Sequence, residues 1–259
     1  MKITQIRNAT IIVEYANNKF LIDPWLCPKE SMAGFDAGIN PQIRQPRVDL
    51  PCDINKITDV DAVILTHFHP DHFDEYAVRA LDKGIKFFVQ SQQDYEIIHS
   101  KGFTNIEILT EKGNHYKNIT MYKTKCQHGK REIIKPLCEQ IGMPYEAMGI
   151  VFKSEHEKTL YIAGDTIWCE EVKEALNIYT PDVIIVNACG ATVQNGEHII
   201  MNLSDIEELL KSAPKSTIIA SHMDTVSHLT VTREDINAYI KEHNITNILV
   251  PNDGETINV

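Results

Sequence analysis

The sequence lacks long apolar runs, paired cysteines and an excess of positive charge, and each absence excludes a class of protein. No apolar stretch approaches the roughly 20 residues that cross a bilayer, so we expect no membrane partner. The first residues, Met1 to Gln5, have no apolar core of the kind that marks a signal peptide. The six cysteines are scattered and form no Cys-x-x-Cys pair, which predicts reduced thiols in a cytoplasmic protein.

Acidic residues outnumber basic ones, 36 to 25, and the net charge at pH 7 is −11. Nucleic-acid-binding proteins are usually basic, so we expect no nucleic acid and instead a small molecule as the partner, with a homo-oligomer left open. The 259 residues, 43% of them hydrophobic, suffice to bury a sizeable core. No linker divides the chain, and residues 1–259 are predicted to form a single domain.

Strands and helices alternate along both halves of the chain. Residues 10–23 are predicted to form a hairpin, and the irregular segment 26–56 is long enough to indicate a covering for a site. Segment 129–148, which contains three basic residues, is either a solvated lid or a contact for an anionic group. The other predicted elements are helices at 74–83, 92–101, 169–178, 204–212 and 232–243, and strands at 61–66, 87–89, 105–109, 115–126, 147–154, 159–163, 182–187, 216–221 and 246–250. This alternation predicts an α/β fold with helices outside central sheets.

One short stretch carries most of the chemical information. His67, His69, Asp71 and His72 place three imidazoles and a carboxylate within six consecutive residues, directly after the apolar run 62–65. Packing gives no reason to crowd these side chains, whereas neutral imidazole is the commonest protein ligand for transition metals. The stretch therefore predicts metal ligands on a loop that leaves a buried strand.

Three further residues follow predicted strands in the same way: His128, Asp165 and His222. Strand ends at one edge of a sheet are a favoured place for active sites, so these side chains are expected to join the first four. Other histidines compete for the roles, and Asp165 is also a candidate cap for the helix that follows it. The competitors of His128 are His115 and His156, and those of His222 are His198 and His228, none of which directly follows a buried strand.

The residue types fit hydrolysis near neutral pH. A divalent metal lowers the pKa of its bound water towards about 7, and two ions roughly 3.5–4 Å apart can hold the resulting hydroxide between them. A bridging ligand needs an anionic group with two oxygens, which suits Asp165. The imidazoles favour two zinc ions, and the carboxylates also admit Mn²⁺ or Fe²⁺.

The motif His-x-His-x-Asp-His, the distant histidine, the Gly-Asp-Thr and the final histidine resemble the metallo-β-lactamase superfamily. The resemblance runs from Asp23 to His222 and implies a four-layer αββα sandwich. It implies that His67, His69 and His128 bind one metal, that Asp71, His72 and His222 bind the second, and that Asp165 bridges them. It also implies that Asp71 is catalytic, because it orients the attacking water.

Within the superfamily, the run Ile22-Asp23-Pro24-Trp25-Leu26 and the run 161–166 resemble the branch that contains ascorbate-6-phosphate lactonase. This resemblance implies a lactone or a phosphorylated metabolite as the substrate. One position departs from the pattern: that branch often has a Gly-His pair before its first strand, and the nearest residues in this chain are Arg7-Asn8-Ala9.

Other functions remain for the same centre. A phosphodiesterase or nuclease is the main alternative, although the acidity of the chain disfavours long nucleic acids. Di-iron redox relatives typically have a carboxylate where this chain has His69. A sensor that binds metal without turnover would not need all seven ligands. Metal analysis combined with an activity screen separates these functions.

Overall fold

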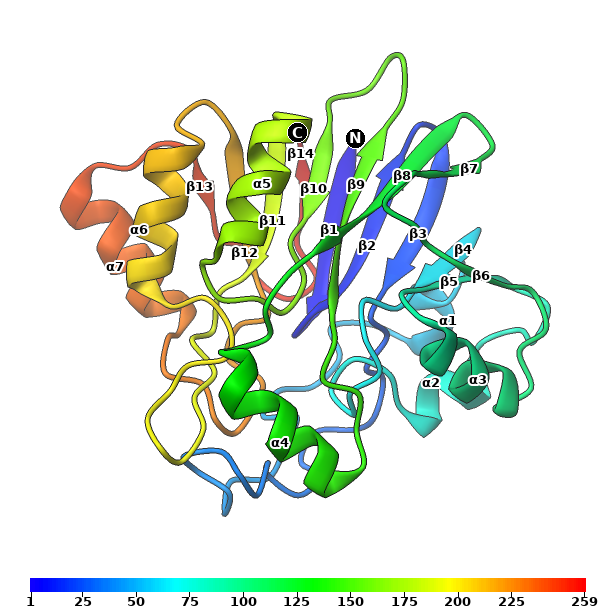
Figure 1. Cartoon of the computed structure of the whole chain (residues 1–259), viewed down its shortest axis with the longest axis horizontal. Coiled ribbons are helices and arrows are strands. Elements are labelled where there is room, and N and C mark those ends of the chain that lie inside the picture. The colour runs from blue at the N-terminus through cyan, green and yellow to red at the C-terminus, as the bar shows by residue number, and fades with distance from the viewer.

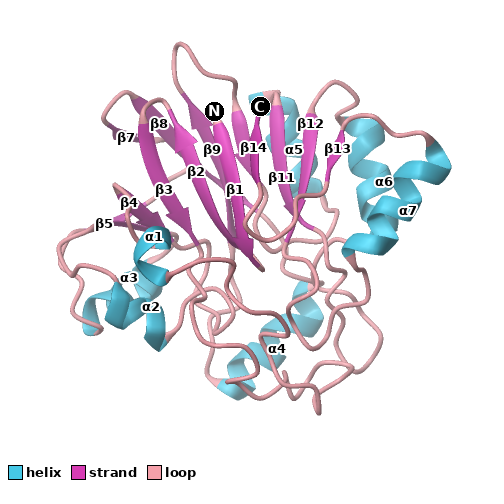
Figure 2. Ribbon diagram, turned by 180° about the vertical axis from the view of Figure 1, so that it is seen from behind, coloured by secondary structure: helices cyan, strands magenta, loops and turns pink.

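The computed structural model describes residues 1–259 as two seven-stranded sheets packed face to face, with helices outside them (Figure 1). Helices α1–α3 lie beside the first sheet and α5–α7 beside the second, while α4 crosses one end of the sandwich (Figures 1 and 2). The four-layer αββα fold predicted from the sequence is confirmed. None of the helices combines the length and the apolarity that crossing a bilayer requires.

The first sheet is built by the N-terminal half of the chain and completed by the last strand, in the order β14-β1-β2-β3-β4-β5-β6. Strands β1 to β3 are antiparallel, as the predicted hairpin requires, and β3 to β6 are parallel. The parallel strands need crossover connections, which contain short helices. The elements are β1 (Lys2–Arg7), β2 (Thr10–Tyr15), β3 (Asn18–Ile22), α1 (Ile54–Ile57), β4 (Ala62–Ile64), α2 (Glu75–Ala80), β5 (Lys86–Val89), α3 (Gln92–Ser100), β6 (Ile106–Ile108) and β14 (Thr256–Asn258).

The second sheet has the order β13-β12-β11-β10-β9-β8-β7. Strands β7 to β10 are antiparallel, and β10 to β13 are parallel with helices in the crossovers. The elements are β7 (Asn114–Tyr116), β8 (Ile119–Lys125), α4 (Arg131–Ile141), β9 (Met148–Lys153), β10 (Leu160–Ile162), α5 (Glu170–Tyr179), β11 (Val183–Asn187), α6 (Leu203–Ser212), β12 (Thr217–Ser221), α7 (Arg233–His243) and β13 (Ile248–Leu249).

Buried strands supply apolar side chains to both of their faces. On β11, Val183 and Ile185 belong to the core between the two sheets, whereas Ile184 and Val186 pack under the outer helices. This follows from the alternation of side chains along a strand, and it explains why the strand is apolar throughout. The sheets are thus fixed from both sides, and the loops at their ends start from a rigid frame.

Segment 129–148 contains a helix that the sequence analysis did not predict. Helix α4 carries Pro136 in its interior, a residue that usually argues against a helix, and it ends at Gly142 in the left-handed conformation. Ile134 and Cys138 are buried on one side of the helix. Their spacing of four residues was the available signal, and the proline obscured it.

Candidate metal centre

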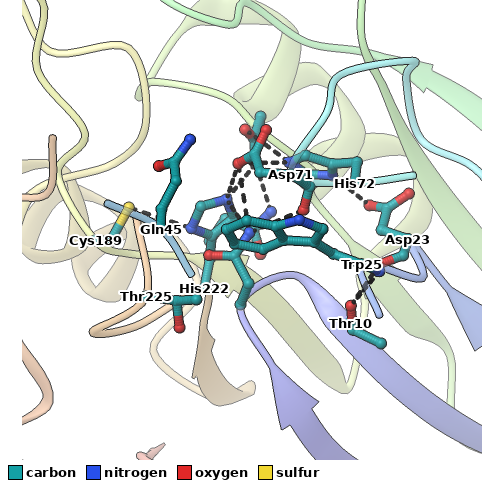
Figure 3. Close-up of polar contacts among 12 residues, drawn as sticks. Thr10, Asp23, Trp25, Gln45, Asp71, His72, Cys189, His222 and Thr225 are labelled. Atoms are coloured by element: carbon teal, nitrogen blue, oxygen red, sulfur yellow. Dashed lines mark hydrogen bonds and ion pairs between the residues drawn. The ribbon is translucent and has the colours of Figure 1, made fainter. Parts of the chain in front are cut away.

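The seven side chains expected to bind metal lie together at the end of the sandwich that α4 covers (Figure 3 draws part of this cluster). The first four leave β4 on one loop. The other three follow β8, β10 and β12 of the second sheet, so both sheets contribute to the cluster. All but His69 and Asp71 are buried, with at most 7% of the residue exposed.

The donor atoms form three overlapping groups, and within each group they lie within 4.8 Å of one another. One group joins His67, His69 and His128, and another joins Asp71, His72 and His222. These are the two triads that the superfamily resemblance implies. The third group contains Asp165 together with His67 and His72, which places this carboxylate between the triads.

Asp165 is central to the cluster. Its Oδ2 lies 3.2 Å from Nε2 of His72 and 3.6 Å from Nε2 of His128. Its Oδ1 lies 3.9 Å from Nε2 of His222. One carboxylate therefore faces imidazoles of both triads, which is the placement a bridging ligand needs. The N-cap residue of α5 is Cys169 and not Asp165, so the alternative role of Asp165 as a helix cap is wrong.

The donor set fits a divalent cation. Nε2 of His67 is completely buried and has no hydrogen-bond partner in the protein, an arrangement that is costly unless the lone pair finds an electrophile. Nε2 of His69 donates a hydrogen bond to the carbonyl oxygen of Pro144 at 2.8 Å. The lone pair of Nδ1 is therefore the one available to a metal. Imidazole nitrogens beside carboxylate oxygens suit zinc and neighbouring transition metals.

The electrostatics of the cluster also favour a cation. Burial lowers the pKa of the His67 imidazole well below its usual value and that of His69 to about 4, so both rings are neutral ligands at pH 7. Burial opposes charge on His72 as well, but the carboxylates of Asp165 and Asp23 raise its pKa to about 10. The carboxylates thus create a field in which positive charge is stabilised.

Hydrogen bonds from surrounding residues orient these ligands. The Asp23 carboxylate accepts hydrogen bonds from the Thr66 backbone N–H and hydroxyl, both at 2.7 Å, and from Nδ1 of His72 at 2.9 Å. The Asn187 amide donates to Oδ1 of Asp165 at 2.6 Å. Such contacts fix the tautomer and direction of a ligand, so that Nε2 of His72 points into the cluster.

Asn8 and Cys189, which belong to neither triad, contact the His222 ring. The Asn8 amide nitrogen lies 3.1 Å from Nε2 of His222 and donates to the Asp71 backbone oxygen at 3.1 Å. The Cys189 thiol lies 3.3 Å from Nδ1 of the same ring (Figure 3). The sequence analysis singled out Asn8 only as a departure from a pattern, and it did not identify Asp23 as an orienting residue. Asp23 follows β3 as the ligands follow their own strands, and this position was the available signal.

The competing histidines have other environments. His115 lies on the edge strand β7 beside the Thr120 hydroxyl, His156 is exposed in a turn, and His198 pairs with Asp205 at 2.9 Å. They lie outside the groups of donors that could hold a metal. His228 is near the cluster without belonging to any of those groups, and it lines the cavity described next.

A cavity of about 320 Å³ opens onto Asp71, His69, His128 and Asp165. Segment 26–56 supplies part of its wall, as predicted, and α4 supplies another part. The lining contains no lysine or arginine. The basic residues of α4 and its N-cap instead form ion pairs at the surface, such as Lys130 with Glu197 at 2.9 Å. The apolar lining residues are Met32, Ala33, Phe35, Ile134, Leu137, Cys138, Ile141, Met143, Ile199 and Ile200.

Comparison with known proteins places this geometry in a family. Residues 18–223 match the model of the beta-lactamase superfamily domain. The UPF0173 protein YddR of Bacillus subtilis is 43% identical over 99% of both chains. The isothiocyanate hydrolase from Delia radicum gut bacteria is 41% identical, with a TM-score of 0.95 over 100% of this chain and 99% of that one. A possible metal-dependent hydrolase from Veillonella parvula is 39% identical, with a TM-score of 0.96 over the same shares.

Proposed function

Because this chain belongs to the metallo-β-lactamase superfamily and to its UPF0173 metal-dependent hydrolases, we propose that it uses two metal ions to hydrolyse small, uncharged, apolar electrophiles. An isothiocyanate is the first candidate substrate. The observation that carries the proposal is an apolar cavity, free of lysine and arginine, that opens directly onto the donor cluster.

The residues available for the ions are those of the two triads. His67, His69 and His128 would hold one ion, the triad of Asp71, His72 and His222 the other, and Asp165 would lie between them. Divalent ions, when bound, lower the pKa of water and polarise a substrate. The number of imidazoles favours zinc, and the carboxylates also admit Mn²⁺ or Fe²⁺.

The chain's own groups supply orientation. The Asp71 carboxylate, whose side chain is 18% exposed, lies at the cavity and can accept a hydrogen bond from the attacking water. Asn8 and His222 hold this carboxylate in place, since Oδ2 of Asp71 lies 3.4 Å from the Asn8 amide nitrogen and 3.3 Å from Nε2 of His222. The apolar wall excludes bulk water and positions the substrate's carbon skeleton.

The nature of the wall discriminates between substrates. A phosphorylated metabolite carries two negative charges that cationic side chains would normally bind, and the lining offers none while including Asp36 and Asp71. An isothiocyanate R–N=C=S is uncharged, and its central carbon is electrophilic. Water adds across the C=N bond to give R–NH–C(=S)–OH, and cleavage of the C–N bond then releases R–NH₂ and carbonyl sulfide. The solved relative named as an isothiocyanate hydrolase, at 41% identity, supports this substrate class.

A lactone is the second candidate substrate. It is an uncharged cyclic ester, so it needs no cationic side chain in the cavity, and its carbonyl carbon is electrophilic. The run of residues 161–166 supports it through the lactonase resemblance. The two candidates differ in the products, which are an amine and carbonyl sulfide in one case and a hydroxy acid in the other.

The test is a matched substrate panel on protein loaded with zinc or manganese. Benzyl isothiocyanate, γ-nonalactone and p-nitrophenyl phosphate are incubated with the enzyme, and the metal content is measured in the same samples. We expect release of benzylamine, no hydrolysis of the phosphate and two metal ions per chain. Fully loaded protein that hydrolyses neither uncharged substrate would overturn the proposed function, and a ratio of one ion per chain would overturn the dinuclear centre.

A further inference from the structure

One histidine in the cavity has no role in the donor cluster. His228 lies in the loop between β12 and α7, six positions after His222, and only 7% of it is exposed. Its Nδ1 is completely buried and has no hydrogen-bond partner in the protein. Nδ1 therefore faces the protein interior, and the ring meets the cavity through Nε2, which forms no hydrogen bond within the protein and is free to bind a ligand.

The loop around His228 is held rigidly. The His228 carbonyl oxygen accepts a hydrogen bond from the Thr192 N–H at 2.9 Å, and the neighbouring Ser227 hydroxyl accepts one from the Phe35 N–H at 3.0 Å. The amide oxygen of Gln45, which is labelled in Figure 3, accepts a hydrogen bond from the Ser227 N–H at 3.1 Å. The bonds with Phe35 and Gln45 tie the loop to segment 26–56, which also lines the cavity.

The ring itself is also fixed in direction. It packs against Phe35 with ring centroids 5.0 Å apart and an interplanar angle of 54°. Gly38 permits this approach, because a Cβ at that position would lie 2.5 Å from Cβ of His228. The imidazole therefore has a fixed position in the wall of the cavity, which Asp71 also lines.

The ring is suited to donate one hydrogen bond. Burial lowers the pKa of His228 to about 4, so the imidazole is neutral at pH 7 and carries one N–H donor and one acceptor nitrogen. No lysine or arginine lines the cavity to take over this role.

We propose that His228 is a catalytic residue that contacts the substrate and donates a hydrogen bond to the heteroatom that becomes negative as water adds to the electrophilic carbon. The proposal rests on the proposed function. For an isothiocyanate that heteroatom is the nitrogen or the sulfur, and for a lactone it is the carbonyl oxygen. His228 provides only the hydrogen bond, so the proton that reaches the product nitrogen still comes from water and the stoichiometry is unchanged.

A hydrogen bond that strengthens as charge develops lowers the barrier more than it improves binding of the substrate. The first experiment therefore compares wild type with His228→Phe, which keeps a ring against Phe35, and His228→Asn, which keeps an N–H donor. His99→Phe, on the exposed face of α3, is the control. We expect kcat for benzyl isothiocyanate to fall about 10²-fold in His228→Phe and less in His228→Asn, with KM changed by less than about threefold and unchanged metal content.

The second experiment does not depend on turnover. O-methyl N-benzylthiocarbamate is a stable analogue of the water adduct, and its binding is followed through the ring resonances of protein labelled with ¹⁵N-histidine. We expect the resonance that is absent from His228→Asn to shift on binding, and the dissociation constant to rise at least about tenfold in His228→Phe.

The outcomes separate the two proposals. If wild type hydrolyses neither an isothiocyanate nor a lactone, the proposed function fails, and the role of His228 fails with it. If wild type is active but His228→Phe retains kcat within about twofold at full metal content, the proposed function stands and the role of His228 is overturned. An unshifted His228 resonance at saturating analogue would also overturn it. Loss of metal from His228→Phe would assign the residue a structural role instead.

Discussion

The cavity has two walls that are held in place by different means. The ligand wall consists of the seven donor residues, and hydrogen bonds from neighbours such as Asp23 and Asn187 orient its side chains. The apolar wall consists of Met32, Phe35, Leu137, Ile141 and Met143, of which Met32, Phe35 and Leu137 pack against the hydrophobic core. Under the proposed function, this difference assigns reaction type and substrate preference to separate parts of the molecule. Packing can be altered without disturbing the ligands, whereas a lost ligand contact changes the chemistry itself.

The strongest test of the ligand wall is Asp71→Ala. We expect kcat to fall roughly 10³-fold, because the carboxylate that orients the attacking water is lost while the strands beneath it remain. The measurement is benzylamine release, with circular dichroism to establish the fold. Asp59→Ala is the control, since that side chain is 91% exposed. Retained activity in Asp71→Ala would remove this residue from the mechanism.

The next test concerns the residues that orient the ligands. In the wild type, the Thr66 N–H and Nδ1 of His72 both donate to oxygens of the Asp23 carboxylate. In Asp23→Asn, one of these two donors would instead face the N–H of the amide. We expect zinc affinity to fall about 10–100-fold, measured by competition with a chelating dye. Asp59→Asn should bind zinc as wild type does. An unchanged affinity in Asp23→Asn would mean that packing alone orients His72.

The apolar wall is tested by Leu137→Ala on α4. We expect kcat/KM for benzyl isothiocyanate to fall about tenfold, because apolar contact with the substrate is lost, and that for methyl isothiocyanate to change by less than about twofold. Metal content should not change. Ile178→Ala, at a side chain that is 60% exposed on α5, is the matched control. An equal loss on both substrates would show that the two walls are not independent.

The smallest effect on activity is expected for Asp94→Asn, far from both walls. Asp94 is fully buried, neither carboxylate oxygen has a hydrogen-bond partner, and burial raises its pKa to about 6. Between about pH 4 and pH 6 the folded state retains a proton that the unfolded state has lost, so this group lowers the free energy of unfolding as pH rises.

The Asp94→Asn variant should therefore be more stable than wild type by roughly 3 kcal/mol at pH 7, and the difference should fall below about 1 kcal/mol near pH 4. Urea unfolding of both proteins at the two pH values measures it, and kcat should stay within about twofold of wild type. A difference of equal size at both pH values would exclude titration of Asp94 as its cause. The result would contrast an unpaired buried carboxylate with the fully partnered ones of the ligand wall.

Much of the ligand wall could be predicted from sequence because the donors lie on loops that leave buried strands. The pattern around His67 to His72 is local, and the positions of His128, Asp165 and His222 follow from strand order. The individual residues of the apolar wall could not be predicted, since Phe35 lies in an irregular segment and Leu137 in a helix that contains Pro136. Their approach to the donors depends on tertiary packing that no short pattern encodes. The contacts of Asn8 and Cys189 with His222 likewise join residues far apart in the chain.

The donors are divided between the two sheets, four of them on the loop after β4 and three after strands of the second sheet. At the same end the sheets are already joined, because the His222 N–H donates to the Asn8 carbonyl oxygen at 2.9 Å and the Ser221 hydroxyl to the Gln5 side-chain oxygen at 2.8 Å. An ion bound by donors from both groups would cross-link the two sheets. We therefore expect removal of the metal to let the two layers open more readily at this edge, which would be measured as faster hydrogen exchange at the ends of β4 and β12.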